Sequence, residues 1–291
     1  MAGTAEIIAT GVYFGEGPRW HGDRLWFSDF FANCVYSVGT DHALRTELTI
    51  ADRPSGLGWL PDGRLLVVSM VDRKVLRREA DGSVVTHADL SGIAEYHCND
   101  MVVDRHGRAY VGNFGFDLDH AVATETVTQL LHERMATLVR VDPDGTVHVA
   151  ARDMKFPNGA VVTGDGRTLI VAETLAQTLT AFTIAEDGSL HDRRIWADLG
   201  GRAPDGICLD ADGDIWVANP LAPEAFLVAE DGGVVDVVDT VEPCFAVALG
   251  GADGRTLYCL TAPSGRADRA AQEPRGALRA VTVDTPGAGI P

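Results

Sequence analysis

Three residues with oxygen-bearing side chains occupy the same position of a repeated sequence unit. Glu16, Asn158 and Asp205 each precede a glycine at the start of an apolar run, and a turn glycine follows six or eight residues later. Carboxylate and amide oxygens without thiolates are ligands that suit Ca²⁺, Mg²⁺ or Mn²⁺. A single Asp or Asn before glycine is usually only a turn former. Repetition of oxygen donors at one position instead favours a shared cation site.

The repeated unit is clearest in Pro204 to Ala218, where a polar loop residue, an apolar run, an Asp-Gly turn and a second apolar run follow one another. This order is typical of a β-hairpin. Six copies begin 39 to 59 residues apart, and a period of about 40 to 50 residues with several strands is typical of a propeller blade. The residues at the loop position, called the ring residues below, are Glu16, Ser55, Asn99, Asn158, Asp205 and Cys244.

The chain is therefore predicted to be all-β, a six-bladed β-propeller formed by a single domain over residues 1–291. Rotation about one axis would place the ring residues around one end of a central channel. The last blade offers three strands, from Phe245 to Leu249, from Thr256 to Thr261 and from Leu278 to Val283. The segment Ala5 to Thr10 is predicted to supply its fourth strand and close the ring, which would remove two exposed edges. A loose N-terminal tail is the alternative.

The longest step between copies, from Asn99 to Asn158, predicts an insertion at about residues 114–137 in the third blade. Within it, Thr124 to Met135 is charged and free of glycine, which favours about three turns of helix. A lid or substrate-selecting loop and a functionally neutral insertion are both compatible with this segment. If the rings of Phe114 and Phe116 reach the channel mouth, they would favour a less polar substrate.

Composition limits the partners of this chain. The formal net charge of −18 argues against nucleic acid, because binding of a phosphate backbone requires a surface of Lys and Arg. It also disfavours anionic membranes, whereas a cation in an acidic channel is compatible with it. An acidic surface without any partner would have the same composition. The expected partner is a small-molecule substrate, and the oligomeric state is not readable from the sequence.

Cysteine usage and the N-terminal segment indicate the compartment. The five cysteines are odd in number, widely spaced and without a C-x-x-C pair, so we expect neither a disulfide framework nor a thiolate zinc site. Residues Met1 to Val12 lack the basic and apolar parts of a secretory signal. No apolar stretch approaches the 18 or so residues that a spanning helix needs. A cytoplasmic location is therefore predicted.

Four short motifs, in this order and spacing, resemble those of the senescence marker protein, gluconolactonase and luciferin-regenerating enzyme family, which is related to diisopropyl fluorophosphatase. They are Gly15-Glu16-Gly17-Pro18 with Trp20, Cys98-Asn99-Asp100, Phe156-Pro157-Asn158-Gly159, and Pro204-Asp205-Gly206. The resemblance implies a six-bladed propeller with one divalent cation in its channel, held by Glu16, Asn158 and Asp205. Ca²⁺ is the expected cation, with Zn²⁺, Mn²⁺, Mg²⁺ and Fe²⁺ as alternatives. It also implies that Asn99 contacts the substrate, as in the lactonases, or ligates calcium, as in the phosphatase-like relatives.

One motif departs from the sugar lactonases of this family. They resemble Arg-x-Asn-Asp where this chain has His97-Cys98-Asn99-Asp100, and the missing Arg argues against a sugar lactone as substrate. His97 is a candidate base or hydrogen-bond partner for the substrate, although a packed or solvated histidine is the commoner case. Asp100 is expected beside the substrate site, where it would hold Asn99 or a ligand in place.

The reaction predicted from these residues is metal-dependent hydrolysis of a lactone or related ester, with the cation as Lewis acid and Asp205 as general base. A serine hydrolase is disfavoured because Gly-x-Ser-x-Gly does not occur, and Ser55 lies in Pro-Ser-Gly. Two other classes stay open, a non-hydrolytic enzyme of the strictosidine synthase type and a propeller whose cation only stabilises a binding surface.

Overall fold

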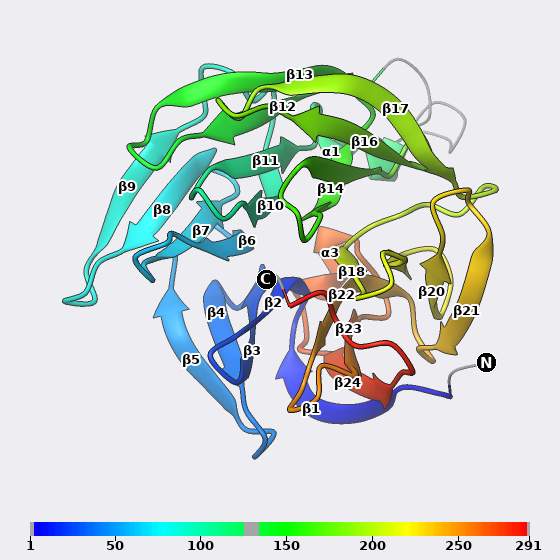
Figure 1. Ribbon diagram of the computed structural model, residues 1–291. Coiled ribbons are helices and arrows are strands. Elements are labelled where there is room, and N and C mark those ends of the chain that lie inside the picture. Colours follow the sequence, from blue (N-terminus) through cyan, green and yellow to red (C-terminus); the bar gives the residue numbers. More distant parts are fainter. Residues whose placement is uncertain (1–2, 125–133, 290–291) are drawn as a thin grey trace.

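Six four-stranded antiparallel sheets surround a central axis in the computed structural model, which describes residues 3–124 and 134–289 (Figure 1). The first three blades are β2 (Gly15–His21), β3 (Arg24–Asp29), β4 (Cys34–Val38), β5 (Leu44–Thr49); β6 (Pro54–Trp59), β7 (Leu65–Ser69), β8 (Lys74–Arg78), β9 (Val84–Asp89); and β10 (Cys98–Val103), β11 (Ala109–Asn113), β12 (Ala136–Val141), β13 (Val147–Met154). The next two are β14 (Pro157–Val162), β15 (Thr168–Glu173), β16 (Thr178–Ile184), β17 (Leu190–Asp198); and β18 (Ile207–Leu209), β19 (Ile215–Asn219), β20 (Glu224–Val228), β21 (Val234–Asp239). The predicted six-bladed propeller is confirmed.

The last blade joins the two ends of the chain. It contains β22 (Cys244–Gly250), β23 (Thr256–Thr261), β24 (Gly276–Thr282) and, outermost, β1 (Glu6–Val12), which pairs antiparallel with β24. Figure 1 shows β1 beside β24. The N–H of Ala5 also donates to the carbonyl of Asp239 in the neighbouring blade, at 2.8 Å. The predicted closure by the N-terminal strand is therefore correct. Pairing with β24 covers the strand edge that the last blade would otherwise expose, and it also gives β1 a partner.

The hydrophobic core consists of apolar layers between adjacent blades. Strand residues of one blade, such as Leu66 and Val68, pack in one buried cluster with Met101 and Val111 of the next blade. Second strands such as β7 and β11 are buried on both faces, so their sequences are mostly apolar and do not alternate. This packing fixes the angular position of each blade, and with it the position of the ring residue at the start of its inner strand.

The inner strands are interrupted next to the ring residues. Pairing with the second strand shifts register between Glu16 and Arg19 in the first blade and between Pro157 and Ala160 in the fourth, and such bulges redirect side chains. The blades also approach closely here. A Cβ atom on Gly56, which follows ring residue Ser55, would lie 2.3 Å from the backbone nitrogen of Met101 in the next blade. The glycine is thus required for blade contact.

Replacing Gly56 by alanine is expected to lower the free energy of unfolding by about 2 kcal/mol, because the added methyl group forces the second and third blades apart. Gly92 is the matched control, since a Cβ atom there meets no atom within 4 Å and its φ is not positive. Denaturant unfolding of both alanine variants measures the effect. Equal stability of the two variants would contradict the proposed close contact.

The predicted insertion lies between β11 and β12 of the third blade. It contains helix α1 (Leu118–Thr124), and most of the helix predicted for Thr124 to Met135 lies outside the described residues. A second short helix that the sequence did not predict, α3 (Ala267–Ala270), lies between β23 and β24. Both helices border the channel mouth, so connections of the third and sixth blades shape the entrance.

Two further expectations concern cysteines and membranes. None of the five cysteines forms a disulfide, and Cys98, Cys244 and Cys259 are buried. Among the helices of the described residues, none has both the length and the apolar character needed to cross a bilayer.

Candidate functional site

A cavity of about 620 Å³ lies at the end of the channel where the inner strands begin. Five of the six ring residues line it, namely Glu16, Ser55, Asn99, Asn158 and Asp205. The sixth, Cys244, is fully buried in a core cluster instead, and its neighbour Phe245 lines the cavity. The three residues predicted as cation ligands therefore lie in one cavity, and their role as ligands stays a prediction.

Hydrogen bonds orient the amide side chains on the cavity floor. Asn99 Nδ2 donates to Asn158 Oδ1 at 3.3 Å, and Asn158 Nδ2 donates to Thr174 Oγ1 at 3.2 Å. The Thr174 hydroxyl in turn donates to the carbonyl of Pro204 at 2.8 Å. Thr174 was not predicted from the sequence, although it lies directly after the second strand of its blade and fixes the amide of Asn158. Asn158 is thereby fixed on the floor, with its Oδ1 accepting from Asn99 and its Nδ2 donating to Thr174.

Two buried carboxyl groups on the floor, those of Glu16 and Asp205, form no ion pair among the described residues. Burial raises the pKa of Glu16 well above its usual range, and the nearby carboxylates of Asp205 and Asp100 raise it further. Burial and the charge of Asp100 likewise raise the pKa of Asp205, with the amide of Asn158 acting in the opposite direction. Buried carboxylates that repel one another favour protonation or a bound cation. The floor is therefore an electrostatically strained, anionic site.

Arg19 lies beneath this floor and was not predicted as a site residue. Its Nη2 is 3.3 Å from Asp100 Oδ1, and both side chains are only 7% exposed. The guanidinium also donates to the carbonyls of Pro18 and Met101. This contact holds Asp100 as a partner of Arg19, so Glu16 and Asp205 are the two carboxylates left for a ligand. A nominal charge of −2 matches a divalent cation.

The donor set fits a hard divalent cation. Asn99 Oδ1 and Asp205 Oδ1 are buried and have no hydrogen-bond partner among the described residues, and buried polar atoms are normally paired. Over residues 3–124 and 134–289, no three His, Cys, Asp or Glu side chains are placed to hold a metal by themselves. Amide oxygens would have to complete the set, as they do in oxygen-ligated calcium sites. Glu16, Asn158 and Asp205 are the residues that would hold it.

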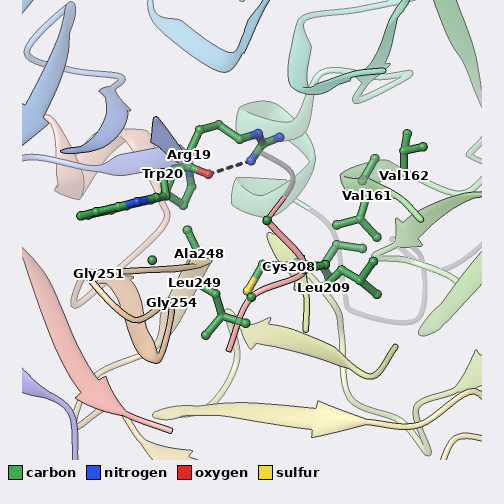
Figure 2. Close-up of a pocket in the computed structure, with 17 residues that line it drawn as sticks. Arg19, Trp20, Val161, Val162, Cys208, Leu209, Ala248, Leu249, Gly251 and Gly254 are labelled. Carbon is green, nitrogen blue, oxygen red and sulfur yellow. Dashed lines mark hydrogen bonds between the residues drawn. The ribbon is translucent and has the colours of Figure 1, made fainter. Parts of the chain in front are cut away.

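A second, smaller cavity of about 150 Å³ lies on the other side of Arg19. Figure 2 shows it between Arg19 and Trp20 of β2, Val161 and Val162 of β14, and Cys208 of β18. Its lining is otherwise apolar or glycine. Arg19 borders this cavity while Asp100 borders the larger one, so their ion pair separates the two along the channel.

His97 and Phe116 are not among the described residues that line the larger cavity. The imidazole of His97 stacks on Tyr96, with ring centroids 4.2 Å apart, and burial lowers its pKa. Phe116 packs against Phe156 and lies under the guanidinium of Arg134. A contact of His97 with substrate stays a prediction that this placement does not favour. Asp100 does line the cavity, as expected.

Six phenylalanine side chains line the cavity above the floor. This aromatic wall consists of Phe14, Phe30, Phe31, Phe114, Phe156 and Phe245. Only Phe114 was predicted to reach the mouth. The sequence does contain signals that could have placed other wall residues at the cavity. Phe14 and Phe156 both stand two residues before a ring residue. Phe30, like Phe114, directly follows the end of the second strand of its blade.

Comparison with known proteins finds lactonases among the relatives of this chain. It is 26% identical over 296 residues to the pentonolactonase XacC of Haloferax volcanii, covering 97% of this chain and 94% of that one. It is 29% identical to the 6-deoxy-6-sulfogluconolactonase of Pseudomonas putida, with 98% and 96% covered. The crystal structure of a calcium-binding protein, regucalcin, from Agrobacterium tumefaciens has the same fold. Its TM-score is 0.80 at 18% identity, with 100% of this chain and 98% of that one covered.

A family model also matches most of the chain. Residues 14–263 match the family described as the SMP-30/Gluconolactonase/LRE-like region. The matched range begins just before Glu16 and extends beyond Asp205, so it includes every residue of the cavity floor. The chain therefore belongs to the SMP-30/gluconolactonase/LRE-like family.

Proposed function

We propose that this protein is a divalent-metal-dependent hydrolase that opens a lactone or a related ester. The observation that supports it most directly is that Glu16 and Asp205, two buried carboxyl groups in no ion pair among the described residues, converge with Asn158 on the floor of one cavity. The floor thus combines a site for a cation with space for a substrate. Ca²⁺ is the cation we expect, because all three donors are hard oxygens.

The comparisons support the reaction class. Two relatives that match nearly the whole chain are named as lactonases, and the structural neighbour from Agrobacterium tumefaciens is titled a calcium-binding protein. Membership of the family supports a hydrolase in general. The specific ligands, the metal dependence and the role of each residue are our proposal for this chain.

The floor residues divide the chemical tasks. When bound, the cation supplies a Lewis acid that polarises the substrate carbonyl. Asp205 takes a proton from the water that adds to the carbonyl carbon, and the proton then goes to the ring oxygen as its bond to that carbon breaks. Asn99 Oδ1 is buried without a partner among the described residues, so it accepts a hydrogen bond from the attacking water and positions that water beside the lactone. The product is the open hydroxy acid.

Metal removal tests the proposal. Removing the metal from the purified protein with a chelator is expected to abolish lactone hydrolysis. Adding Ca²⁺ at about 100 times its Kd is expected to raise the melting temperature by about 5 °C or more, because the cation binds only the folded floor. Elemental analysis of the protein as purified identifies the metal, and Mn²⁺, Mg²⁺, Zn²⁺ and Fe²⁺ are compared in the same assay.

A matched pair of variants tests whether the thermal shift with Ca²⁺ depends on the cavity floor. Glu16→Gln is expected to lose the thermal shift with Ca²⁺, whereas Glu230→Gln, at an exposed site, is expected to retain it. A full thermal shift in Glu16→Gln would contradict the proposed ligand set. A thermal shift in the native protein without turnover of any lactone would instead support a binding propeller stabilised by its cation.

A further inference from the structure

We infer that the substrate carries an apolar aryl or alkyl group on its lactone or ester function, and that the aromatic wall holds this group. The inference rests on the proposed hydrolase function and specifies its substrate class. It follows from the division of the cavity into a polar floor, an aromatic wall and a rim of ion pairs.

The aromatic wall forms two packed groups on the cavity side of the blades. Phe14 contacts Phe30, Phe31 and Phe245, with ring centroids 5.3, 6.2 and 4.7 Å away. The second group pairs Phe114 with Phe156 at 4.9 Å. Met70 continues the first group. Aromatic pairs at these distances are mutually stabilised, so the wall is a built surface and not a scatter of single side chains.

A buried carboxylate holds the wall in place. Asp29 Oδ2 accepts a hydrogen bond from the N–H of Tyr13 at 2.7 Å, and its Oδ1 accepts bonds from Phe14, Phe31 and Ala32, each at 3.2 Å. Asp29 thereby fixes the two loops that carry three of the six rings. A wall whose loops are fixed before binding loses little conformational entropy when an apolar group packs on it.

The rim offers an anionic group only two basic side chains among the described residues, Arg53 and Arg266. Its charged side chains are already engaged, since Arg53 pairs with Asp119 at 3.5 Å and lies over the ring of Phe31, and Arg266 pairs with Asp268 at 2.9 Å. With the divalent cation bound, the two floor carboxylates would be matched in charge, so the floor offers no net positive charge to an anion. The wall therefore selects for an uncharged group.

A sugar lactone would meet the wrong surface in this cavity. Its hydroxyls would face phenyl rings, which offer no conventional hydrogen-bond partner, and each unpaired buried hydroxyl weakens binding by roughly 5- to 150-fold. An alkyl or aryl group gains from the same contact. The cavity volume of about 620 Å³ lies within the range of pockets that enclose drug-sized ligands. Size and lining therefore both accommodate a lactone with a bulky apolar substituent.

The test compares two lactones with the same six-membered ring, δ-decalactone with its alkyl chain and glucono-δ-lactone with its hydroxyls. With the metal-loaded protein, kcat/KM for δ-decalactone is expected to exceed that for glucono-δ-lactone by about 100-fold or more, after correction for spontaneous hydrolysis. The aryl lactone dihydrocoumarin is expected to rank with δ-decalactone. Equal or higher kcat/KM for glucono-δ-lactone would overturn the inference while leaving the proposed hydrolase intact.

Wall variants show whether the rings carry this preference. Phe31→Gln and Phe114→Gln alter partly buried rings, and each is expected to lower kcat/KM for δ-decalactone about tenfold more than kcat/KM for unsubstituted δ-valerolactone. Ile195→Gln, on the outer strand β17 where the side chain is 65% exposed, is the control and should change neither. Unchanged turnover of δ-decalactone in both wall variants would contradict a role of the wall.

Binding of unreactive analogues separates the two proposals. The lactams that correspond to δ-decalactone and glucono-δ-lactone are titrated calorimetrically against the metal-loaded protein, and the alkyl lactam is expected to bind about 100-fold more tightly. If no lactone is hydrolysed but this difference is found, the hydrolase proposal fails and the apolar preference holds. If lactones are hydrolysed and the alkyl lactam binds no more tightly, the apolar preference fails.

Discussion

Replacing Asp205 by asparagine is expected to lower kcat/KM for any lactone substrate by about 10³-fold or more. The substituted amide would keep the size of the side chain, but it can neither accept the proton of water nor supply a negative charge to the cation. The rate of lactone hydrolysis by the metal-loaded variant is measured from the amount of hydroxy acid formed. Asp231→Asn, at an exposed turn, is the control and should leave kcat/KM unchanged.

Stability distinguishes this loss from simple unfolding. Because burial and Asp100 raise the pKa of Asp205, its carboxylate strains the metal-free floor. The metal-free Asp205→Asn protein is therefore expected to be at least as stable as the native protein, while the thermal shift with Ca²⁺ disappears. Retained activity, or a large loss of stability without metal, would contradict the role assigned to Asp205.

Replacing Arg19 by methionine is expected to lower the free energy of unfolding by about 3 kcal/mol or more, because it leaves the buried carboxylate of Asp100 without its ion-pair partner. The guanidinium also lowers the pKa of Glu16, so its loss adds to the repulsion on the floor. Denaturant unfolding measures the change. The double variant Arg19→Met with Asp100→Asn is expected to recover part of the loss, since it removes the unpaired charge.

A second buried ion pair provides the control for Arg19. Arg108 Nε donates to Asp104 Oδ2 at 2.7 Å in the third blade, away from the cavity. Arg108→Met is expected to lower stability to a similar extent but to leave the Kd for Ca²⁺ unchanged, whereas Arg19→Met is expected to change it. The same Kd in both variants would mean that Arg19 has only a structural role.

The repeat predicted the architecture because it is written in local signals. Asp-Gly turns, apolar runs and a constant spacing specify hairpins, and rotation about an axis then brings distant residues such as Glu16 and Asp205 together. The strand exchange in the last blade was also predictable, since that blade lacked a fourth strand of its own. Each of these conclusions needs only the pattern along the chain.

The remaining features depend on contacts that the pattern does not encode. Arg19 lies in the short strand β2, and only the three-dimensional structure shows that its side chain reaches Asp100 next to a bulge. His97 stands at the repeat position of Phe14 and Phe156, yet it stacks on the adjacent Tyr96 and does not line the cavity. Side-chain direction at a loop position is set by its neighbours in space, so the aromatic wall emerged only with the fold.

The pairing of β1 with β24 has a consequence for biosynthesis. Among the propeller strands described, β1 is synthesised first. It has no partner until β24, which is synthesised last, has been made. During that interval the partly built ring presents open strand edges, which can pair with other nascent chains. We therefore expect a chain truncated before Gly276 to associate with other copies and to engage chaperones, where the whole chain seals itself.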